Sequence, residues 1–458
     1  MTDFKDKKII ILGFGEEGES VANFLLDRGA IVSAVDVRNK DKFDDEKIKK
    51  FESRGVKFRF DSYPDDFGGF DLAVRSPGIS TESAVVKKIS KRGIKVTSST
   101  KIFFELCPCP IIGITGTKGK STTSSLIYEM LRADGKDVYL GGNIGLPPLN
   151  FLKELKSDSY VVLELSSFQL QDLTQSPHVA VFLMVTGEHL DYHGGFKEYI
   201  DAKRNILRFQ TPNDFAVVNR DYPASNESDV LSVGQIYYVS RERAVDNGCF
   251  VRDESIWVRI DDKENKVIDA KDVLLKGKHN LENVCAAVMA ATIVGVGIKT
   301  MVGVLKGFRG LEHRLELVGT KRGITFYNDS LATVPEATIE AMETLGDDVE
   351  TVILGGYDRG LDYSELGKYL SNSKVKTLIL FPTTGEKIWA EISRLVPNEH
   401  MRPAKYDASS MREAVVIASE ITGEGKICLM SPAASSFNMF KNYKDRGEQF
   451  KEEVNKLQ

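Results

Sequence analysis

Short apolar runs alternate along the chain with segments in which apolar residues recur every three or four positions. The runs at 7–12, 31–35 and 71–75 predict buried strands, and a further strand is expected at 93–97. A helical pattern between the first two runs extends to about Arg28. Because strands alternate with helices, this part of the chain is typical of a Rossmann-like domain with a parallel sheet.

The alternation continues through the rest of the chain. In the middle we expect strands at 111–115, 160–165 and 179–185, a helix at 196–207, strands with charged turns and a hairpin candidate (261–266) within 213–275, and a helix at 281–294. In the last third we expect strands at 324–328, 349–354, 376–381 and 426–430 with helices between them, which favours a further parallel sheet. Since 458 residues are too many for one core, we predict three α/β domains at 1–99, 100–310 and 311–458.

Composition narrows the class of protein. The apolar fraction of 42% and charged fraction of 28% are typical of a soluble globular protein. A net charge of −5 argues against a nucleic-acid partner, and no apolar run reaches the roughly 18 residues that a membrane span needs. The N-terminus lacks a signal-peptide pattern, and Cys107-Pro-Cys109 has the wrong spacing for a CxxC pair. We therefore expect a cytoplasmic protein with reduced thiols.

The segment Ile111–Thr123 carries the first candidate chemistry. An apolar strand leads into Gly-Thr-Lys-Gly-Lys-Ser-Thr and then into a helix, an arrangement that cradles phosphate with backbone N–H groups. In such a loop Lys120 would neutralise phosphates and Ser121 would bind Mg²⁺. A strict P-loop has glycine where Ile114 stands, so an ordinary glycine-rich turn is the alternative.

A second glycine motif follows the first predicted strand. Gly13-Phe-Gly-Glu-Glu-Gly18 matches the dinucleotide fingerprint, and the next strand ends at Asp36. The motif suits NAD or another nucleotide, although Glu16 and Glu17 oppose a tight grip on an anion. Ser76-Pro-Gly78 lies at the ligand-binding edge of the same sheet, or forms a plain turn.

Three further residues suggest a metal site. Glu164 lies in an apolar strand and needs a partner that Mg²⁺ would supply, unless it faces solvent. His189 follows another buried strand, where a structural role is equally open. Lys203 falls on the apolar stripe of the 196–207 helix, so it either reaches water along its stem or is buried, and a neutral amine can form a carbamate with CO₂.

In the last third, polar residues follow the predicted strands at Asn328-Asp329, at 355–360 and at 431–436. Thr333-Val-Pro-Glu336 matches a capping box, which would give Thr333 a structural role. Asn280 is expected to cap the helix that begins at Leu281.

Taken together, these motifs resemble the Mur ligase family, most closely its D-glutamate-adding members, over the whole chain. The matching segments are Gly113–Thr122, Gly142–Gly145, Glu164–Gln169, His189–Asp191, Ala202-Lys203, Lys278–Asn280, His313-Arg314, Asn328–Ser330 and Ser431–Ala433. The resemblance accounts for Ile114, because the family's phosphate loop has this form.

The resemblance implies sets of residues for each ligand. For ATP these are Gly116, Thr117, Lys118, Gly119, Lys120, Ser121, Thr122, Asn280, Arg314 and Asp329. For the uridine nucleotide they are Gly13, Phe14, Gly15, Glu16, Asp36, Arg38, Ser76, Gly78 and Asn143. For the amino acid they are Thr333, Arg359, Ser436 and Tyr443. Two Mg²⁺ ions would be bound by Ser121, Glu164, His189 and a CO₂-derived carbamate on Lys203, and the catalytic residues would be Lys120, His189 and Lys203.

The sequence departs from the common family pattern at a few positions. Leu331 stands where many relatives have lysine, and Lys118 stands where asparagine is usual. Glu188 occupies the position before the histidine, where relatives have an acid or amide. Arg359 stands where a lysine often meets the amino acid, and its guanidinium suits a carboxylate.

The implied activity is ATP-dependent addition of D-glutamate to UDP-N-acetylmuramoyl-L-alanine through an acyl phosphate, by a monomer without a membrane or nucleic-acid partner. The alternatives are a related Mur or folylpolyglutamate-synthase-type ligase with another amino acid, an NAD-dependent dehydrogenase, and a nucleotide sensor without turnover. The dehydrogenase alternative leaves the phosphate loop unexplained.

Overall fold

The computed structural model describes residues 4–185, 195–275, 277–310 and 312–457. The chain divides into two compact units. The first unit comprises Met1–Val273 and His279–Lys306, and the second comprises Leu274–Lys278 and Gly307–Gln458. No helix in the described ranges combines the length and apolar character that a bilayer crossing requires.

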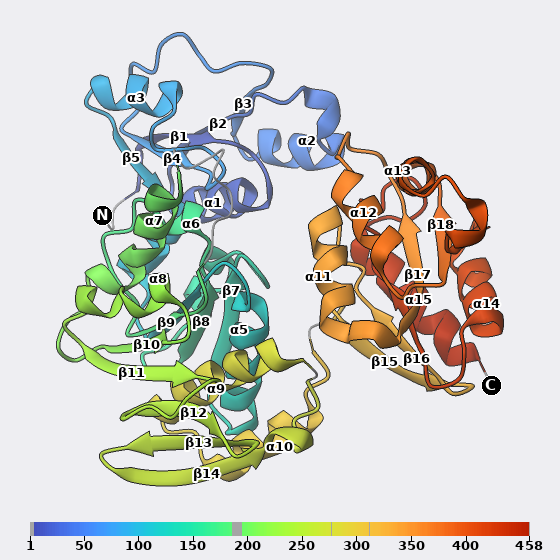
Figure 1. The fold of residues 1–458 in the computed structure, drawn as a ribbon. Helices are drawn as coiled ribbons and strands as arrows, with labels where there is room; N and C mark the ends of the chain where they lie inside the picture. The colour runs from blue at the N-terminus through green and yellow to red at the C-terminus, as the bar shows by residue number, and fades with distance from the viewer. Residues whose placement is uncertain (1–3, 186–194, 276, 311, 458) are drawn as a thin grey trace. The chain divides into compact units, whose positions relative to one another are not determined.

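The N-terminal sheet of the first unit is parallel, with strand order β3-β2-β1-β4-β5 (Figure 1). Along β1, Ile9 and Ile11 enter one apolar core while Ile10 and Leu12 enter another. Burial of both faces explains why the strand reads as a continuous apolar run. The elements are β1 (Lys8–Leu12), α1 (Glu16–Leu26), β2 (Ile31–Val35), α2 (Asp45–Ser53), β3 (Lys57–Arg59), β4 (Leu72–Arg75), α3 (Ala84–Lys91) and β5 (Lys95–Ser98).

The central sheet has the order β14-β13-β12-β11-β10-β9-β6-β8-β7. Pairing is parallel from β7 to β12 and antiparallel from β12 to β14. Its strands are β6 (Ile111–Thr115), β7 (Val138–Gly142), β8 (Tyr160–Glu164), β9 (Val179–Phe182), β10 (Phe215–Asn219), β11 (Gln235–Ser240), β12 (Gly248–Arg252), β13 (Ser255–Ile260) and β14 (Lys263–Asp269). The predicted hairpin is confirmed, with its turn at Asp261-Asp262.

Helices of the central part cover this sheet. They are α4 (Ser99–Leu106), α5 (Lys120–Ala133), α6 (Ser167–Leu170), α7 (Phe196–Arg208), α8 (Pro223–Asn226), α9 (Lys278–Ile293) and α10 (Ile298–Gly307). One apolar core extends from β1 through α4 into the strands around β6, and Phe103 and Phe151 meet edge to face within it. The two sheets of the first unit therefore share a core.

The second unit has the order β15-β16-β20-β17-β18-β19. Its helices α11 to α13 pack on one face of the sheet and α14 and α15 on the other (Figure 1). The elements are β15 (Glu316–Lys321), β16 (Ile324–Asn328), α11 (Pro335–Leu345), β17 (Val349–Gly355), α12 (Ser364–Asn372), β18 (Thr377–Phe381), α13 (Thr384–Leu395), β19 (Ala404–Asp407), α14 (Met411–Ile421), β20 (Ile427–Met430) and α15 (Tyr443–Lys456).

The structure corrects three sequence predictions. The edge strands β15 and β19 were not expected, and β15 is antiparallel to its neighbour, so the sheet is not purely parallel. Helix α9 begins at Lys278, which makes Asn280 the third helical residue and not the N-cap. The capping box at Thr333 is also wrong: Pro335 takes the first helical position, which its fixed φ favours, and moves the N-cap to Val334.

Arg446 of α15 ties two loops of the second unit together. Its side chain is fully buried and donates to Ser330 O at 2.8 Å and to Ala434 O at 2.9 Å. It also donates to Ser330 Oγ at 3.0 Å. Burial lowers the pKa of this guanidinium to about 10. The loops after β16 and β20 are thus held by one side chain.

We expect Arg446→Met to destabilise the second unit by about 3 kcal/mol, because buried oxygens would lose charged donors. Hydrogen exchange should then accelerate in segments 328–334 and 431–443. Arg412→Met, at an exposed position of α14, serves as the matched control. Equal exchange in both variants would contradict this assignment.

Candidate nucleotide and ligase site

The phosphate-loop candidate follows β6, which pairs with β8 on one side and β9 on the other. The carboxyl ends of neighbouring parallel strands are where such sheets bind ligands. Gly119 precedes α5 with φ of 83°, and a Cβ there would lie 2.1 Å from Asn283 Oδ1. A Cβ on Gly116 would lie 2.8 Å from Leu183 Cβ. Glycine is therefore required at both positions, and the N-terminus of α5 faces the loop as a phosphate site requires.

Two lysines converge on this loop. Lys120 donates from Nζ to Gly116 O at 3.1 Å and to Thr117 O at 2.8 Å. Lys203 of α7 donates to the same Gly116 carbonyl at 2.8 Å. With 2% exposure, Lys203 is buried and does not reach water. Tyr199, one turn earlier, lies under its amine at 4.6 Å and hydrogen-bonds Thr117 at 3.1 Å.

Glu164 closes the end of β8 beside the loop. It is 1% exposed, which excludes the solvent-facing alternative. Oε1 accepts from Asn143 Nδ2 at 3.0 Å, and Asn143 N donates to Glu164 O at 2.9 Å. Oε2 is buried and has no hydrogen-bond partner among the described residues. Gly142 makes this pairing possible, since a Cβ there would lie 2.2 Å from Glu164 O.

Asn280 also reaches the loop, through its neighbour on α9. Its Oδ1 accepts from Asn283 Nδ2 at 3.1 Å, and Asn283 is the residue that faces Gly119. Asn283 was not predicted from the sequence. It lies one helical turn after Asn280, on the same face of α9.

The glycine loop after β1 is closed by Asp36. This carboxylate accepts from Phe14 N at 2.8 Å and, through both oxygens, from the Arg38 guanidinium at 2.8 and 3.0 Å. Burial alone would raise the pKa of Asp36, but the hydrogen bonds from Arg38 and Phe14 outweigh it and hold the pKa below its usual value. The ring of Phe14 packs on Phe51 and Phe58, so its side chain belongs to the apolar core.

Ser76 joins the same loop from β4. Its hydroxyl donates to Gly13 O at 3.1 Å, and its backbone N–H donates to Leu12 O. Gly15, Glu16 and Gly78 are exposed beside these segments. The structure therefore brings the predicted uridine-nucleotide residues of the N-terminal sheet to one edge, while Asn143 lies with Glu164.

The predicted residues of the second unit gather at the carboxyl edge of its sheet. Asp329 accepts from Ser431 Oγ at 2.7 Å and from Leu315 N at 3.1 Å. Arg359 donates to Ser435 Oγ at 3.5 Å, beside buried Ser436. Further residues at or near this edge are Arg314, Thr333 and Tyr443, whose carbonyl accepts from Ser330 Oγ at 2.7 Å. His189 lies outside the described residues.

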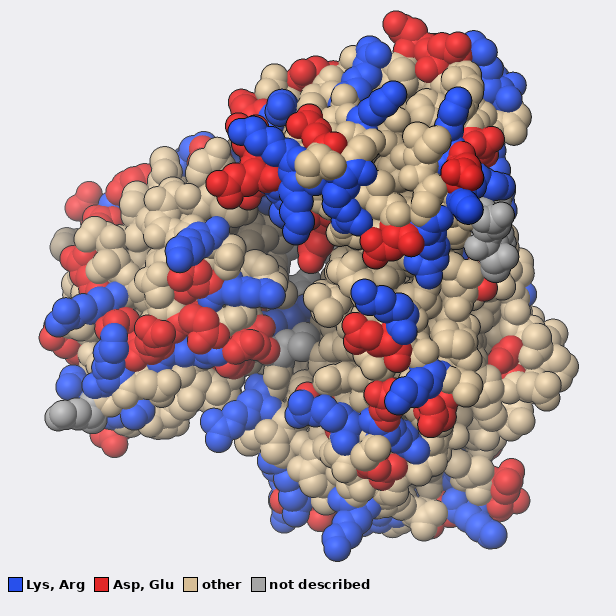
Figure 2. Space-filling view, turned by 180° about the vertical axis from the view of Figure 1, so that it is seen from behind, with Lys and Arg blue, Asp and Glu red and all other residues tan. Residues whose placement is uncertain are grey.

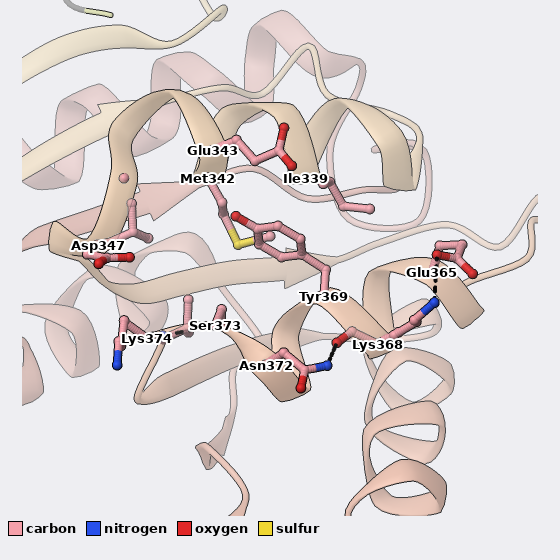
Figure 3. Close-up of a pocket in the computed structure, with 13 residues that line it drawn as sticks. Ile339, Met342, Glu343, Asp347, Glu365, Lys368, Tyr369, Asn372, Ser373 and Lys374 are labelled. Atoms are coloured by element: carbon pink, nitrogen blue, oxygen red, sulfur yellow. Dashed lines mark hydrogen bonds and ion pairs between the residues drawn. The ribbon is translucent and has the colours of Figure 1, made fainter.

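Two other features of the second unit lie apart from this edge or are already occupied. A cavity of about 640 Å³ between α11 and α12 opens at the amino ends of β17 and β18, opposite to Arg359 (Figure 3). Glu312, His313 and Glu448 place metal-ligand atoms within 4.8 Å of one another. The Lys451 amine lies 2.5 Å from Glu312 and 2.7 Å from Glu448, so a side-chain cation already balances this cluster.

Charge is mixed on one face of the molecular surface. Lys and Arg lie among Asp and Glu over the face drawn in Figure 2, which shows no extended field of one sign. This distribution agrees with the small net charge of the sequence.

Comparison with known proteins identifies the family. Residues 7–98 match the Mur ligase MurD-like N-terminal domain, 114–291 the Mur ligase middle domain and 313–434 the Mur ligase glutamate ligase domain. The UDP-N-acetylmuramoylalanine–D-glutamate ligase of Acetivibrio thermocellus is 38% identical, covering 99% of this chain and 97% of the relative. The enzyme of the same name from Clostridium acetobutylicum is 35% identical, with the same coverage. The chain therefore belongs to the Mur ligase family, and it is an ATP-dependent ligase.

A solved structure agrees with this fold. The UDP-N-acetylmuramate-alanine ligase MurC of Thermotoga maritima superposes with a TM-score of 0.56 at 16% identity, covering 98% of this chain and all of the other. The predicted family and the three-domain α/β fold class are confirmed.

Asp36 provides a pH-dependent test of the N-terminal loop. Its folded pKa lies below the ordinary 3.8, so its stabilising effect is present above about pH 4 and is lost as the pH falls through the folded value. We expect Asp36→Asn to speed hydrogen exchange of segment 12–36 about 5- to 30-fold at pH 7.

This difference from the unsubstituted protein should shrink below pH 4. Asp41→Asn, whose side chain is 67% exposed, is the control. A difference that stays constant down to pH 3 would disprove the role of the Asp36 charge.

Proposed function

We propose that the protein adds D-glutamate to UDP-N-acetylmuramoyl-L-alanine in peptidoglycan precursor synthesis, with conversion of ATP to ADP and phosphate. The observation that carries the proposal is the convergence of Lys120, Lys203 and Glu164 on one phosphate loop. Relatives that bear this ligase name match over nearly their full length. The named relatives supply the amino acid and the nucleotide substrate.

The reaction needs an activated carboxylate, because amide formation from free acid and amine is unfavourable in water. The carboxylate of the nucleotide substrate attacks the γ-phosphate of ATP, which releases ADP and leaves an acyl phosphate. Lys120 and the backbone N–H groups of 116–122 stabilise the charge on the transferred phosphoryl group. The amine of D-glutamate then attacks the acyl carbon, and phosphate departs.

The residues around the loop fit Mg²⁺. Magnesium takes carboxylate and hydroxyl oxygens, and Glu164 Oε2 is a buried carboxylate oxygen without a hydrogen-bond partner in the described part of the chain. Ser121 and Glu164 would hold one ion, and His189 with carbamylated Lys203 would hold a second. Bound Mg²⁺ supplies charge neutralisation at the phosphates.

A carbamate on Lys203 is favoured by its surroundings. The amine is buried, and it contacts a carbonyl oxygen and a ring face. Addition of CO₂ to the neutral amine forms a C–N bond and releases one proton. The resulting anion would serve as a metal ligand next to the phosphate loop.

The amino acid would bind at the carboxyl edge of the second unit. Arg359 can clamp a carboxylate with two parallel hydrogen bonds, which suits the side chain of glutamate. Ser436, Tyr443 and Thr333 would complete this site. We retain the boundaries 1–99, 100–310 and 311–458 for the uridine-nucleotide, ATP and amino-acid domains, and we expect a monomer in the cytoplasm.

Lys120→Ala tests the ATP site. With ATP, Mg²⁺, UDP-N-acetylmuramoyl-L-alanine and D-glutamate, phosphate release and product formation should fall at least about 1,000-fold, since the loop loses the lysine amine expected to neutralise the transferred phosphate. Lys49→Ala, at an exposed position of α2, should retain full activity. Full turnover by Lys120→Ala would refute the site.

The unsubstituted enzyme is assayed with D-glutamate, L-glutamate, D-aspartate and L-alanine in parallel. Product formation with D-glutamate alone supports the substrate assignment. A product with another amino acid and none with D-glutamate would retain the ligase and overturn its proposed substrate.

Lys203 is tested without relying on turnover. We expect ¹³C-bicarbonate to give a carbamate carbon signal in NMR spectra of the unsubstituted protein, and Lys203→Met to lack it. Activity of the variant should fall strongly and recover in part with a short-chain carboxylic acid. A spectrum without the carbamate signal at saturating bicarbonate would overturn the modification.

A further inference from the structure

Buried polar contacts connect the uridine-nucleotide segments of the N-terminal sheet to the segment that follows Glu164. We call the five residues that make them, Glu17, Arg75, Ser99, Gln169 and Asp172, the clasp. They come from α1, β4, α4, α6 and the residues directly after α6. All five belong to the first unit, so their contacts lie within one compact body.

Arg75 forms one half of the clasp. It is the last residue of β4, directly before Ser76, and its side chain is fully buried. It donates to both carboxylate oxygens of Asp172, at 2.6 and 3.3 Å, and to Phe168 O at 3.3 Å. It also donates to Ile79 O at 3.0 Å. The turn after β4 is thereby fixed to the segment around α6.

Glu17 forms the other half. It lies in the first turn of α1, and its carboxylate accepts from Ser99 Oγ at 2.5 Å and from Gln169 Nε2 at 3.0 Å. Helices α1 and α6 lie close together in Figure 1. The Glu17 carboxylate is thus hydrogen-bonded to residues of both α4 and α6.

Gln169 links Glu17 to the segment that follows Glu164, the proposed metal-binding carboxylate. Its Oε1 accepts from Ser166 N at 3.0 Å and from Ser166 Oγ at 3.1 Å, which completes a capping box on α6. Ser166 is two residues beyond Glu164, and the intervening Leu165 carbonyl accepts from Thr115 Oγ1 at 2.8 Å. Hydrogen bonds thus connect Glu17 to the strand ends that hold Glu164 and the phosphate loop.

Such a network has a particular physical effect. The shared apolar core holds the two sheets together, but apolar contacts are non-directional and permit small shifts. Charged hydrogen bonds in a buried setting are directional, and one missing partner leaves a costly unpaired group. The clasp therefore fixes one position of the glycine loop relative to the Glu164 segment.

We propose that Glu17 and Arg75 are positioning residues that set the distance from the uridine-nucleotide loop to the phosphate loop. This inference rests on the proposed function, in which one nucleotide substrate spans both loops. Its uridine end is held by the N-terminal sheet, and its carboxylate must meet the γ-phosphate. A shift of the two sheets would misplace that carboxylate, and a displacement of about 1 Å can cost 100-fold in rate.

Glu17→Ala and Glu17→Gln provide the test. Glu17→Ala should lower kcat about 10- to 100-fold and change the KM for ATP and for UDP-N-acetylmuramoyl-L-alanine by less than about threefold. Glu17→Gln should recover most of kcat, because its amide oxygen can accept from Gln169 while its NH₂ donates to Ser99. Glu52→Ala, at an exposed position of α2, is the matched control.

A structural role alone would lower the folded fraction and leave kcat per folded molecule unchanged, and that result would overturn the proposal. A rise in KM for the nucleotide with unchanged kcat would also overturn it, since Glu17 would then act in binding. If Glu17→Ala does not fold, Ser99→Ala removes only one hydroxyl and should reduce kcat about two- to fivefold with unchanged KM.

The clasp and the proposed function fail in distinguishable ways. Absence of ligation by the unsubstituted protein with every amino acid refutes the function. Normal ligation by that protein together with normal kcat for Glu17→Ala refutes the clasp alone.

Discussion

The carbonyl oxygen of Gly116 is the point on which the candidate site depends. It accepts from both Lys120 and Lys203, so the phosphate loop and α7 are joined at one atom. The loop has this course because Gly116 and Gly119 admit no side chain, and because β6 lies between β8 and β9. Glu164 then comes to the same strand edge. The proposed phosphate contacts, metal ligands and carbamate all depend on this arrangement.

Buried strands were predictable from the sequence because both of their faces are covered. The apolar runs at 31–35 and 324–328 coincide with β2 and β16. Edge strands were not predictable in the same way: β15 and β19 are partly exposed and carry no continuous apolar run. The predicted helix starts were wrong at two positions. At Asn280 and Thr333 the side chain suits an N-cap, but the neighbouring residues begin the helix elsewhere.

Candidate site residues could be predicted from the sequence where the residues of one motif are adjacent, as in Gly116–Ser121. Burial of Lys203 could be suspected from the stripe on α7, but the stripe alone could not exclude snorkelling. Contacts between distant segments gave no local signal. Asn143 meets Glu164 and Arg75 meets Asp172 only because the sheets pack in a particular register. Resemblance to a family predicted the site residues, whereas the hydrogen bonds between them required the structure.

The shared core of the first unit has a consequence for how the chain unfolds. Since Phe103 and Phe151 belong to the same apolar cluster as Ile9 and Ile11, loss of the N-terminal sheet would expose the core of the central one. The two sheets should therefore open as one cooperative body. The second unit buries separate clusters on the two faces of its own sheet. We therefore expect the three domains of the chain to unfold as two cooperative units.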